Sequence, residues 1–132
     1  MTINTIRATI EQRIVAEMAL APPYPVHYGN APFNPPNNSP WLDVAIRFGD
    51  DAYATVSDFN RQNGVLVINI YAPIGAGAAI AFTIAERVKA LFNRINTGGI
   101  IFQAGNGPSQ VTPASPEAYY QTQVIIPFEA YQ

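Results

Sequence analysis

The sequence predicts an α+β fold in which two helices pack on a mostly antiparallel sheet. Two segments carry the three-to-four-residue apolar spacing of amphipathic helices, and several others alternate apolar and polar residues as half-buried strands do. Their order is helix, two strands, helix and further strands, which differs from the repeating pattern of parallel α/β proteins. We therefore expect one domain spanning residues 1–132, with both helices on one face of the sheet.

The first predicted helix occupies the N-terminal part of the chain. Its apolar stripe consists of Ile3, Ile6, Ile10, Ile14 and Met18. This spacing places the five side chains on one helix face, and charged residues lie largely off it. The helix ends before Pro22 and Pro23, because proline lacks an amide hydrogen and clashes with the preceding turn.

Residues 22–40 hold seven of the twelve prolines and can form neither a regular helix nor a central strand. Three aromatic residues, Tyr24, Tyr28 and Phe33, punctuate the segment. Two explanations are open. The segment is a long connection whose aromatic side chains pack on the protein's own core, or it is an extended arm laid on a neighbouring subunit. Extended proline-rich segments suit the second role because they lose little entropy on docking.

Two strands are predicted between residues 41 and 71. Residues Trp41–Phe48 alternate as a half-buried strand, and the nearly continuous apolar run Val65–Tyr71 predicts a central strand. Residues 49–63 between them form a polar loop or a long hairpin tip. We expect this loop to be mobile in the isolated subunit and to contact a partner. Its charged residues without evident local partners are Asp50, Asp51, Asp58 and Arg61.

A second helix follows a break at Pro73, Gly75 and Gly77. Its apolar stripe consists of Ile80, Ile84, Val88, Leu91, Phe92 and Ile95. We expect Gly98–Gly99 to end this helix. The basic residues near its C-terminal end complement the helix dipole; they are Arg87, Lys89 and Arg94.

The remaining residues predict two strands and a loop. Ile100–Phe102 forms a short strand, residues 104–117 are loop-like, and the alternating residues Tyr120–Phe128 form the last strand. Pro127 predicts that this last strand ends there or lies at a sheet edge, since proline cannot donate to a ladder.

The composition favours association with other protein. Net charge is −2, and only 12% of residues are charged, about half the usual share. Such a surface exposes neutral and apolar groups, which promotes assembly. No basic stripe predicts nucleic-acid binding. The chain lacks cysteine, a signal peptide and any apolar run near the ~20 residues of a membrane span.

No set of residues predicts catalysis, a metal site or a cofactor. His27 is the only histidine and is expected to be an ordinary loop residue. The acidic residues Asp50, Asp51 and Asp58 lack the alternate spacing and final glutamate of a calcium loop. Gly75-Ala76-Gly77 resembles a dinucleotide loop, but Ile80 occupies the third glycine position and no acidic residue ends a following strand. A tight strand-to-helix turn explains this motif.

One longer segment resembles a known family. It begins at Arg61, continues through Gly64 and the apolar strand to Pro73-Ile-Gly75-Ala-Gly77, and ends in an amphipathic helix at Phe92. This order of Arg-x-x-Gly, strand, Pro-x-Gly-x-Gly and helix resembles the small tail-terminator-like proteins of long-tailed bacteriophages. An N-terminal helix and the prolines Pro35–Pro36 before a first strand extend the resemblance over nearly the whole chain.

The resemblance implies a tail-terminator-like fold and a structural, non-enzymatic role in the virion. Six copies would form a ring that caps the tail tube protein and meets the head-completion proteins of the neck. DNA would pass through the ring without specific binding. No membrane is involved, and the protein would be made in the host cytoplasm. The interface residues we expect are Tyr24, Tyr28, Phe33, Asp50, Asp51, Asp58 and Arg61.

Two alternatives remain at this point. Another head-to-tail connector or minor tail subunit would share this composition and size. A small ligand-binding domain or enzyme using the turn at Gly75 belongs to a different class. An oligomer that binds no nucleotide favours a structural role, whereas a monomer that binds one favours the second alternative.

Overall fold

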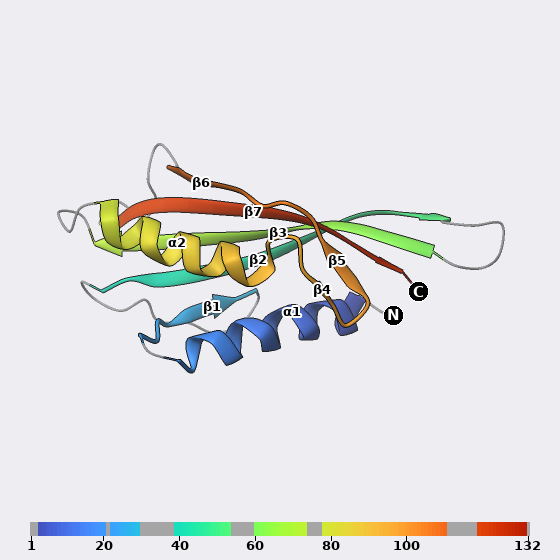
Figure 1. The fold of residues 1–132 in the computed structure, drawn as a ribbon, viewed down its shortest axis with the longest axis horizontal. Helices are drawn as coiled ribbons and strands as arrows, with labels where there is room; N and C mark the ends of the chain where they lie inside the picture. Colours follow the sequence, from blue (N-terminus) through green and yellow to red (C-terminus); the bar gives the residue numbers. More distant parts are fainter. Residues whose placement is uncertain are drawn as a thin grey trace.

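A computed structural model of the protein describes residues 3–20, 22–29, 39–53, 60–73, 78–110 and 119–131. These residues form two helices and seven strands (Figure 1). Their order is α1 (Ile3–Met18), β1 (Val26–Tyr28), β2 (Trp41–Tyr53), β3 (Asn60–Pro73), α2 (Ala78–Phe92), β4 (Asn96–Thr97), β5 (Ile100–Phe102), β6 (Asn106–Gln110) and β7 (Tyr119–Tyr131). This arrangement confirms the predicted α+β class.

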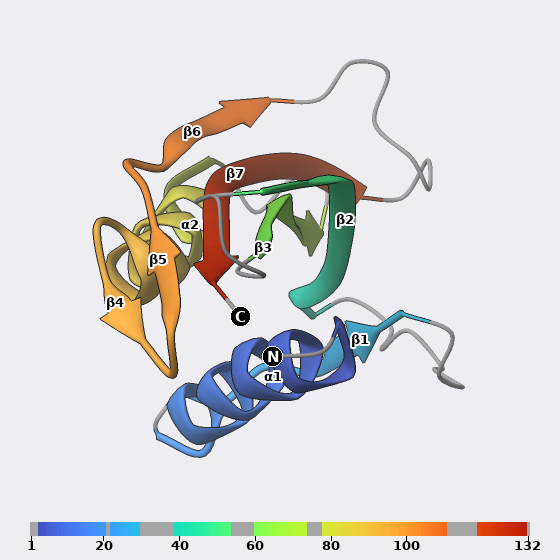
Figure 2. The same ribbon diagram turned by 90° about the vertical axis from the view of Figure 1, so that its right-hand side faces the viewer.

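All seven strands join one sheet, whose long central members are β2, β3 and β7. These three pair antiparallel, and β1 adds a short parallel pairing at the outer edge of β2. At the other edge, β7 pairs with β6 along one part of its length and with β5 along another, and β4 pairs with β5. Figure 2 shows the strong twist of the sheet seen along its strands.

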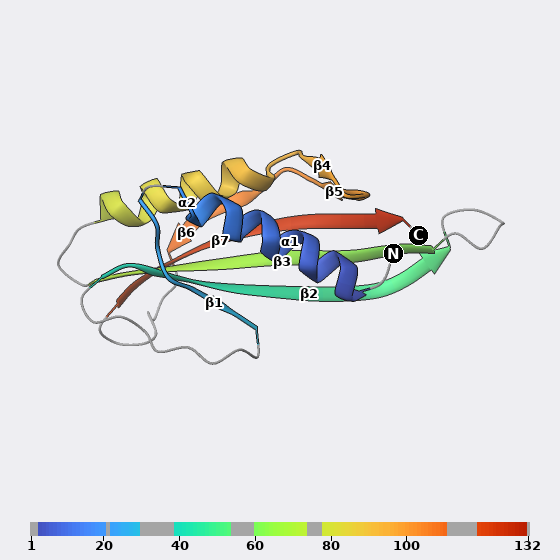
Figure 3. The ribbon, with the colours of Figure 1, turned by 90° about the horizontal axis from the view of Figure 1, so that it is seen from below.

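Both helices pack on the same face of this sheet. One core cluster contains the buried side chains of α1 and α2 together with alternate residues of the three long strands. The helices lie along the strands in Figure 3. The strand residues that face them are Leu42, Val44, Leu66, Ile68, Ile70, Val124, Ile126, Phe128 and Ala130. The opposite face of the sheet carries no described helix.

The apolar stripe predicted for α1 is confirmed except at its first member. Ile6, Ile10, Ile14 and Met18 are buried, whereas Ile3 at the helix start is 52% exposed. The helix ends at Met18, before the two prolines.

The second helix ends earlier than predicted. Arg94 adopts a left-handed conformation with φ of 56° directly after the helix, and Ile95 then pairs with Phe102 through a 2.8 Å backbone bond. The prediction that Gly98 and Gly99 end the helix was therefore wrong. They adopt positive φ values of 58° and 80° in the turn that joins β4 to β5, a conformation that glycine adopts without a steric cost.

Arginine side chains hold the two helices together in a reciprocal way. Arg13 of α1 donates to the carbonyl of Leu91 at the end of α2 (2.9 Å). Arg87 of α2 donates to the Glu17 carboxylate and to the Glu17 carbonyl (both 2.8 Å) near the end of α1, and further to the Leu20 carbonyl. Each helix thus satisfies C-terminal carbonyls of the other. Arg87 was predicted to complement the dipole of α2, its own helix. Its side chain instead donates to carbonyls at the end of α1.

The segment between the first two long strands is largely paired. Residues Gly49–Tyr53 continue β2 and Asn60–Asn63 begin β3, so the loop prediction was wrong for both stretches and the hairpin alternative is correct there. The hairpin extends beyond the end of the helices (Figure 1). Residues outside a core carry no hydrophobic alternation, yet their backbones still form the ladder. Asp58 lies outside the described residues, as do Gly75 and Gly77.

Two predictions for the C-terminal region were also wrong. Residues Asn106–Gln110, expected as loop, form β6. Pro127 neither ends β7 nor lies at an edge, because β7 continues to Tyr131 between β3 and β5. The Pro127 carbonyl accepts from the Gln103 amide (2.9 Å), so the backbone groups of Pro127 point away from β3. The nitrogen of Pro127, which has no hydrogen, also faces the side of β5 and β6. The ladder between β7 and β3 therefore loses no hydrogen bond.

Candidate functional site

Three surfaces of the described structure are candidates for binding: the proline-rich connection, the helix-free face of the sheet and the open edge of β2. In the connection, Tyr24 and Tyr28 are partly buried and pack against the protein's own core. Burial, reinforced by the negative charge of Glu11, raises the pKa of the Tyr28 hydroxyl. These two tyrosines therefore make the intramolecular contacts of a pinned connection. Phe33 lies outside the described residues.

The predicted hairpin residues lie on neighbouring strands. Asp50 and Asp51 belong to β2, and Arg61 of β3 lies opposite Ala52 in the register. Gln62 belongs to no motif of the sequence, yet its side chain is only 4% exposed. Its amide donates to the carbonyls of Gly49 (2.8 Å) and Asn63 (3.0 Å). These two hydrogen bonds stabilise the shift in strand register between Phe48 and Asp51.

A row of polar side chains crosses the helix-free face of the sheet. Successive pairings place one member on each of five strands; the row is His27, Asp43, Asn69, Gln123 and Ser109. Nδ1 of His27 lies 2.8 Å from Oδ1 of Asp43. Oδ1 of Asn69 accepts from the side-chain amides of Gln121 and Gln123, both at 3.1 Å.

His27 is thus placed differently from the expectation of an ordinary loop residue. It belongs to β1 and has a carboxylate partner, which the sequence could not show because the two residues meet only through the parallel pairing. The serine of this row, Ser109, lies on β6 at the opposite end of the row from His27 and Asp43, so it is not placed to act as a nucleophile with that pair.

Beside this polar row, Trp41 stacks on Tyr71 with ring centroids 4.3 Å apart and planes inclined by 15°. Both side chains are buried, at 7% and 9% exposure, and form a second cluster away from the main core. Burial, with the negative charge of Asp43 adding to it, raises the pKa of the Tyr71 hydroxyl. The offset stacking of two large rings stabilises the helix-free face locally.

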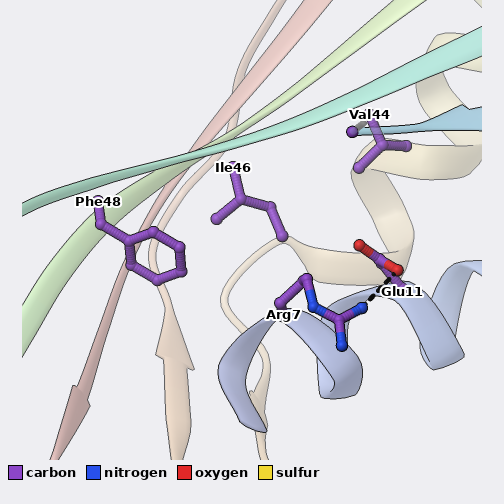
Figure 4. Close-up of a pocket in the computed structure, with 6 residues that line it drawn as sticks. Arg7, Glu11, Val44, Ile46 and Phe48 are labelled. Atoms are coloured by element: carbon purple, nitrogen blue, oxygen red, sulfur yellow. Dashed lines mark hydrogen bonds and ion pairs between the residues drawn. The ribbon is translucent and has the colours of Figure 1, made fainter. Parts of the chain in front are cut away.

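The open edge of β2 adjoins a cavity. β1 pairs with β2 only from Leu42 to Val44, although β2 extends to Tyr53. The cavity lies between β2 and α1 and has a volume of about 130 Å³ (Figure 4). Its lining residues are Arg7, Glu11, Gly29, Val44, Ile46 and Phe48.

This cavity has an apolar strand side and a charged helix side. Arg7 donates to Glu11 at 2.9 Å along the outer surface of α1, so the charges on the rim are paired with each other. The cavity can accept an apolar side chain, and the carboxylate of its described lining, Glu11, is engaged by Arg7. No group of three His, Cys, Asp or Glu residues suited to a metal ion exists within the described ranges. No helix in the described part of the chain is long and apolar enough to cross a membrane.

Comparison with known proteins finds the same fold elsewhere. One solved structure aligns with 98% of this chain and 96% of its own chain, with a TM-score of 0.73 and 24% sequence identity. At this identity the likeness defines the fold. No curated protein sequence matches.

Residues 5–128 match the family described as phage tail terminator protein. The chain belongs to this family, as its sequence resemblance predicted, and is a component of the virion tail.

Proposed function

We propose that this chain is the tail terminator subunit that caps the phage tail tube as a homohexameric ring and joins it to the head-completion proteins of the neck. The family match over residues 5–128 carries this proposal. The low content of charged residues supports it, because a neutral surface associates readily with other protein. Such a subunit is made in the host cytoplasm and acts through interfaces, with no reaction of its own and no cofactor.

The ring is proposed to let DNA pass without binding it. Six copies at −2 each carry −12. Basic side chains already serve the fold: Arg13, Arg87 and Lys89 donate to backbone carbonyls of the chain itself. Binding to DNA depends on cations that neutralise phosphates. A gel shift at physiological salt is expected to show no tight complex, and nanomolar affinity for duplex DNA would contradict this part of the proposal.

The hairpin formed by the ends of β2 and β3 is proposed to contact a partner in the tail. It extends beyond the helices and carries the acidic residues Asp50 and Asp51 (Figure 1). Hydrogen exchange of peptides covering residues 49–63 should slow when the subunit binds tail tubes. Equal exchange with and without tubes would place the contact elsewhere.

Electron microscopy of the purified protein, alone and mixed with tail tubes, tests the whole proposal. We expect six-fold rings and a cap at one end of each tube. Another connector or minor tail subunit would leave the tube ends uncapped. A strictly monomeric protein that ignores tubes would contradict the terminator function. A thermal-shift panel of nucleotides and divalent metals tests the ligand-binding alternative: a ligand at a hundred times its dissociation constant adds roughly 2.7 kcal/mol of stability.

A further inference from the structure

The edge of β2 beyond β1 has backbone groups directed away from the sheet. The amide of Leu42 donates to the carbonyl of Pro25 on the β1 side (2.9 Å). Backbone groups of alternate residues in a strand point to the same side. Those of Ile46 and Phe48 therefore point to this edge, whereas those of Ala45 and Arg47 point to β3. No described strand pairs with β2 on this side beyond Val44.

The short strand β1 shows what an added strand would look like. Val26 and Tyr28 face inward and pack against the core, while His27 faces the opposite way and meets Asp43. The cavity beside Ile46 and Phe48 lies where the next inward side chain of a continued strand would be. Its volume of about 130 Å³ suits an apolar side chain, because a cavity of ~150 Å³ accommodates benzene.

This edge also lacks the usual protection within the described residues. Natural proteins blunt exposed edges with proline, lysine or bulges. β6 at the opposite edge contains Pro108 and a register shift, and β4 is two residues long. In β2, the irregularity begins only after Phe48. Residues Ala45–Phe48 thus keep a regular edge beside a cavity whose strand side is apolar, which is the combination that strand addition uses.

We propose that Ala45–Phe48 of β2 accepts an extended segment from a second copy of this chain, with one apolar side chain of that segment filling the cavity. This inference rests on the proposed ring and names one of its contacts. A closed ring requires two different surfaces of one subunit to meet. The two sides of the sheet end in different edges, β1 and β2 on one side and β4 and β6 on the other, so one subunit has unlike surfaces to bring together.

Charges elsewhere on the subunit fit contact between unlike surfaces. The exposed side chain of Arg47 beside this edge makes no hydrogen bond or ion pair with the described residues, and the same is true of the exposed Glu86 side chain on α2. The two side chains carry opposite charges and lie on different elements. Arg47 of one copy can therefore attract Glu86 of another copy, whereas two copies of the same surface would repel each other. The subunit thus has a cation at the accepting edge and an anion on a distant surface.

Gly29 offers a direct test. A Cβ at Gly29 would meet no atom within 4 Å, and the backbone there is outside the left-handed region. Gly29→Leu is therefore expected to fold normally and to place its side chain at the cavity. It should shift the midpoint of assembly at least tenfold to higher protein concentration, measured by light scattering. Ala16→Leu introduces the same leucine side chain at an exposed position of α1 and should assemble like the wild type.

Hydrogen exchange provides a second readout. Peptides covering Ala45–Phe48 should exchange slowly in the assembled wild type and quickly in unassembled Gly29→Leu. If the wild type assembles and Gly29→Leu assembles equally well, the contact proposed here is wrong while the ring stands. Protection that appears only after tail tubes are added would assign the edge to the tube protein instead. A wild type that stays at 14.3 kDa with and without tubes refutes the ring itself.

Discussion

Gly64 allows two aromatic side chains to meet across the sheet, and replacing it with alanine should destabilise the protein. Gly64 lies between Phe48 and Phe128 in the strand register. The rings of these two residues meet edge to face with centroids 6.0 Å apart. A Cβ on Gly64 would overlap Cζ of Phe128 and lie 2.9 Å from both Cε1 of that ring and the carbonyl oxygen of Arg47. The backbone atom cannot move without disturbing the ladder.

The magnitude follows from the cost of overpacking. Inserting a methyl group into a well-packed core costs about 1–3 kcal/mol. Phe128 is 2% exposed and also touches Phe102, with centroids 5.9 Å apart, so its ring cannot turn outward to relieve the overlap. For a chain of this length, Gly64→Ala should therefore lower the melting temperature by roughly 4–12 °C.

Gly49→Ala is the matched control on the neighbouring strand. A Cβ there would lie 3.6 Å from the carbonyl oxygen of Asn63, an ordinary contact distance. This substitution should be neutral or stabilising by up to about 1 kcal/mol, because alanine restricts the unfolded chain. Urea denaturation of both variants measures the difference. In a double-mutant cycle, Phe128→Leu should recover part of the cost of Gly64→Ala. Equal stability of the two alanine variants would refute the overlap argument.

Three further predictions concern stability. Arg87→Met keeps the aliphatic stem but removes the donors to Glu17, and should lower the free energy of unfolding by about 2 kcal/mol. Urea denaturation measures this loss, and an unchanged midpoint would show that water satisfies the carbonyls instead. The Thr122 hydroxyl is buried without a hydrogen-bond partner among the described residues, so Thr122→Val should raise the free energy of unfolding by about 1 kcal/mol; a loss would reveal a hidden partner. The pKa values of Tyr28 and Tyr71 are raised in the folded state, so their contribution to stability is fully present below pH 10 and is lost as pH rises through the folded values. Stability should fall above about pH 10, and Tyr71→Phe should reduce that fall; an identical alkaline profile would contradict the assignment.

The parts of the fold that sequence predicts are those where burial leaves a periodic pattern. The stripe of α1, the alternation at the start of β2 and the apolar run in β3 all arise because one or both faces of these elements lie in the core. Burial also explains why α2 was recognised, since its interior side chains pack on β3 and β7. The short strand Ile100–Phe102 was found with its bounds for the same reason: both of its end residues are buried.

The sequence fails where strand pairing continues through polar residues. The hairpin beyond Phe48 is held by backbone bonds and by Gln62, neither of which produces a hydrophobic period. The prediction that Pro127 ends β7 or lies at an edge was wrong for a related reason. The sequence does not show toward which neighbouring strand the nitrogen of a proline points. The end of α2 depends on Arg94 in a left-handed conformation, which is unusual for a non-glycine residue and so has no sequence signature.

The candidate binding edge was beyond prediction because it depends on neighbours that are far apart in the sequence. The alternation of β2 shows which side chains face the core, but not that β1 stops opposite Val44. The interface residues proposed from the sequence were chosen as aromatic or charged side chains. The edge at Ile46 and Phe48 is instead defined by backbone groups, whose availability only the sheet topology reveals.

The distribution of hydrogen-bonding groups indicates why this edge, rather than the helix-free face, should direct assembly. On that face the strongest polar groups bond to one another: His27 meets Asp43, and Asn69 accepts from Gln121 and Gln123. Groups that are already bonded add little directional attraction to a partner, because a new bond must replace an old one. The backbone groups of the β2 edge have no such partner among the described residues. A partner strand would therefore gain directional bonds there without disrupting any that the subunit makes itself.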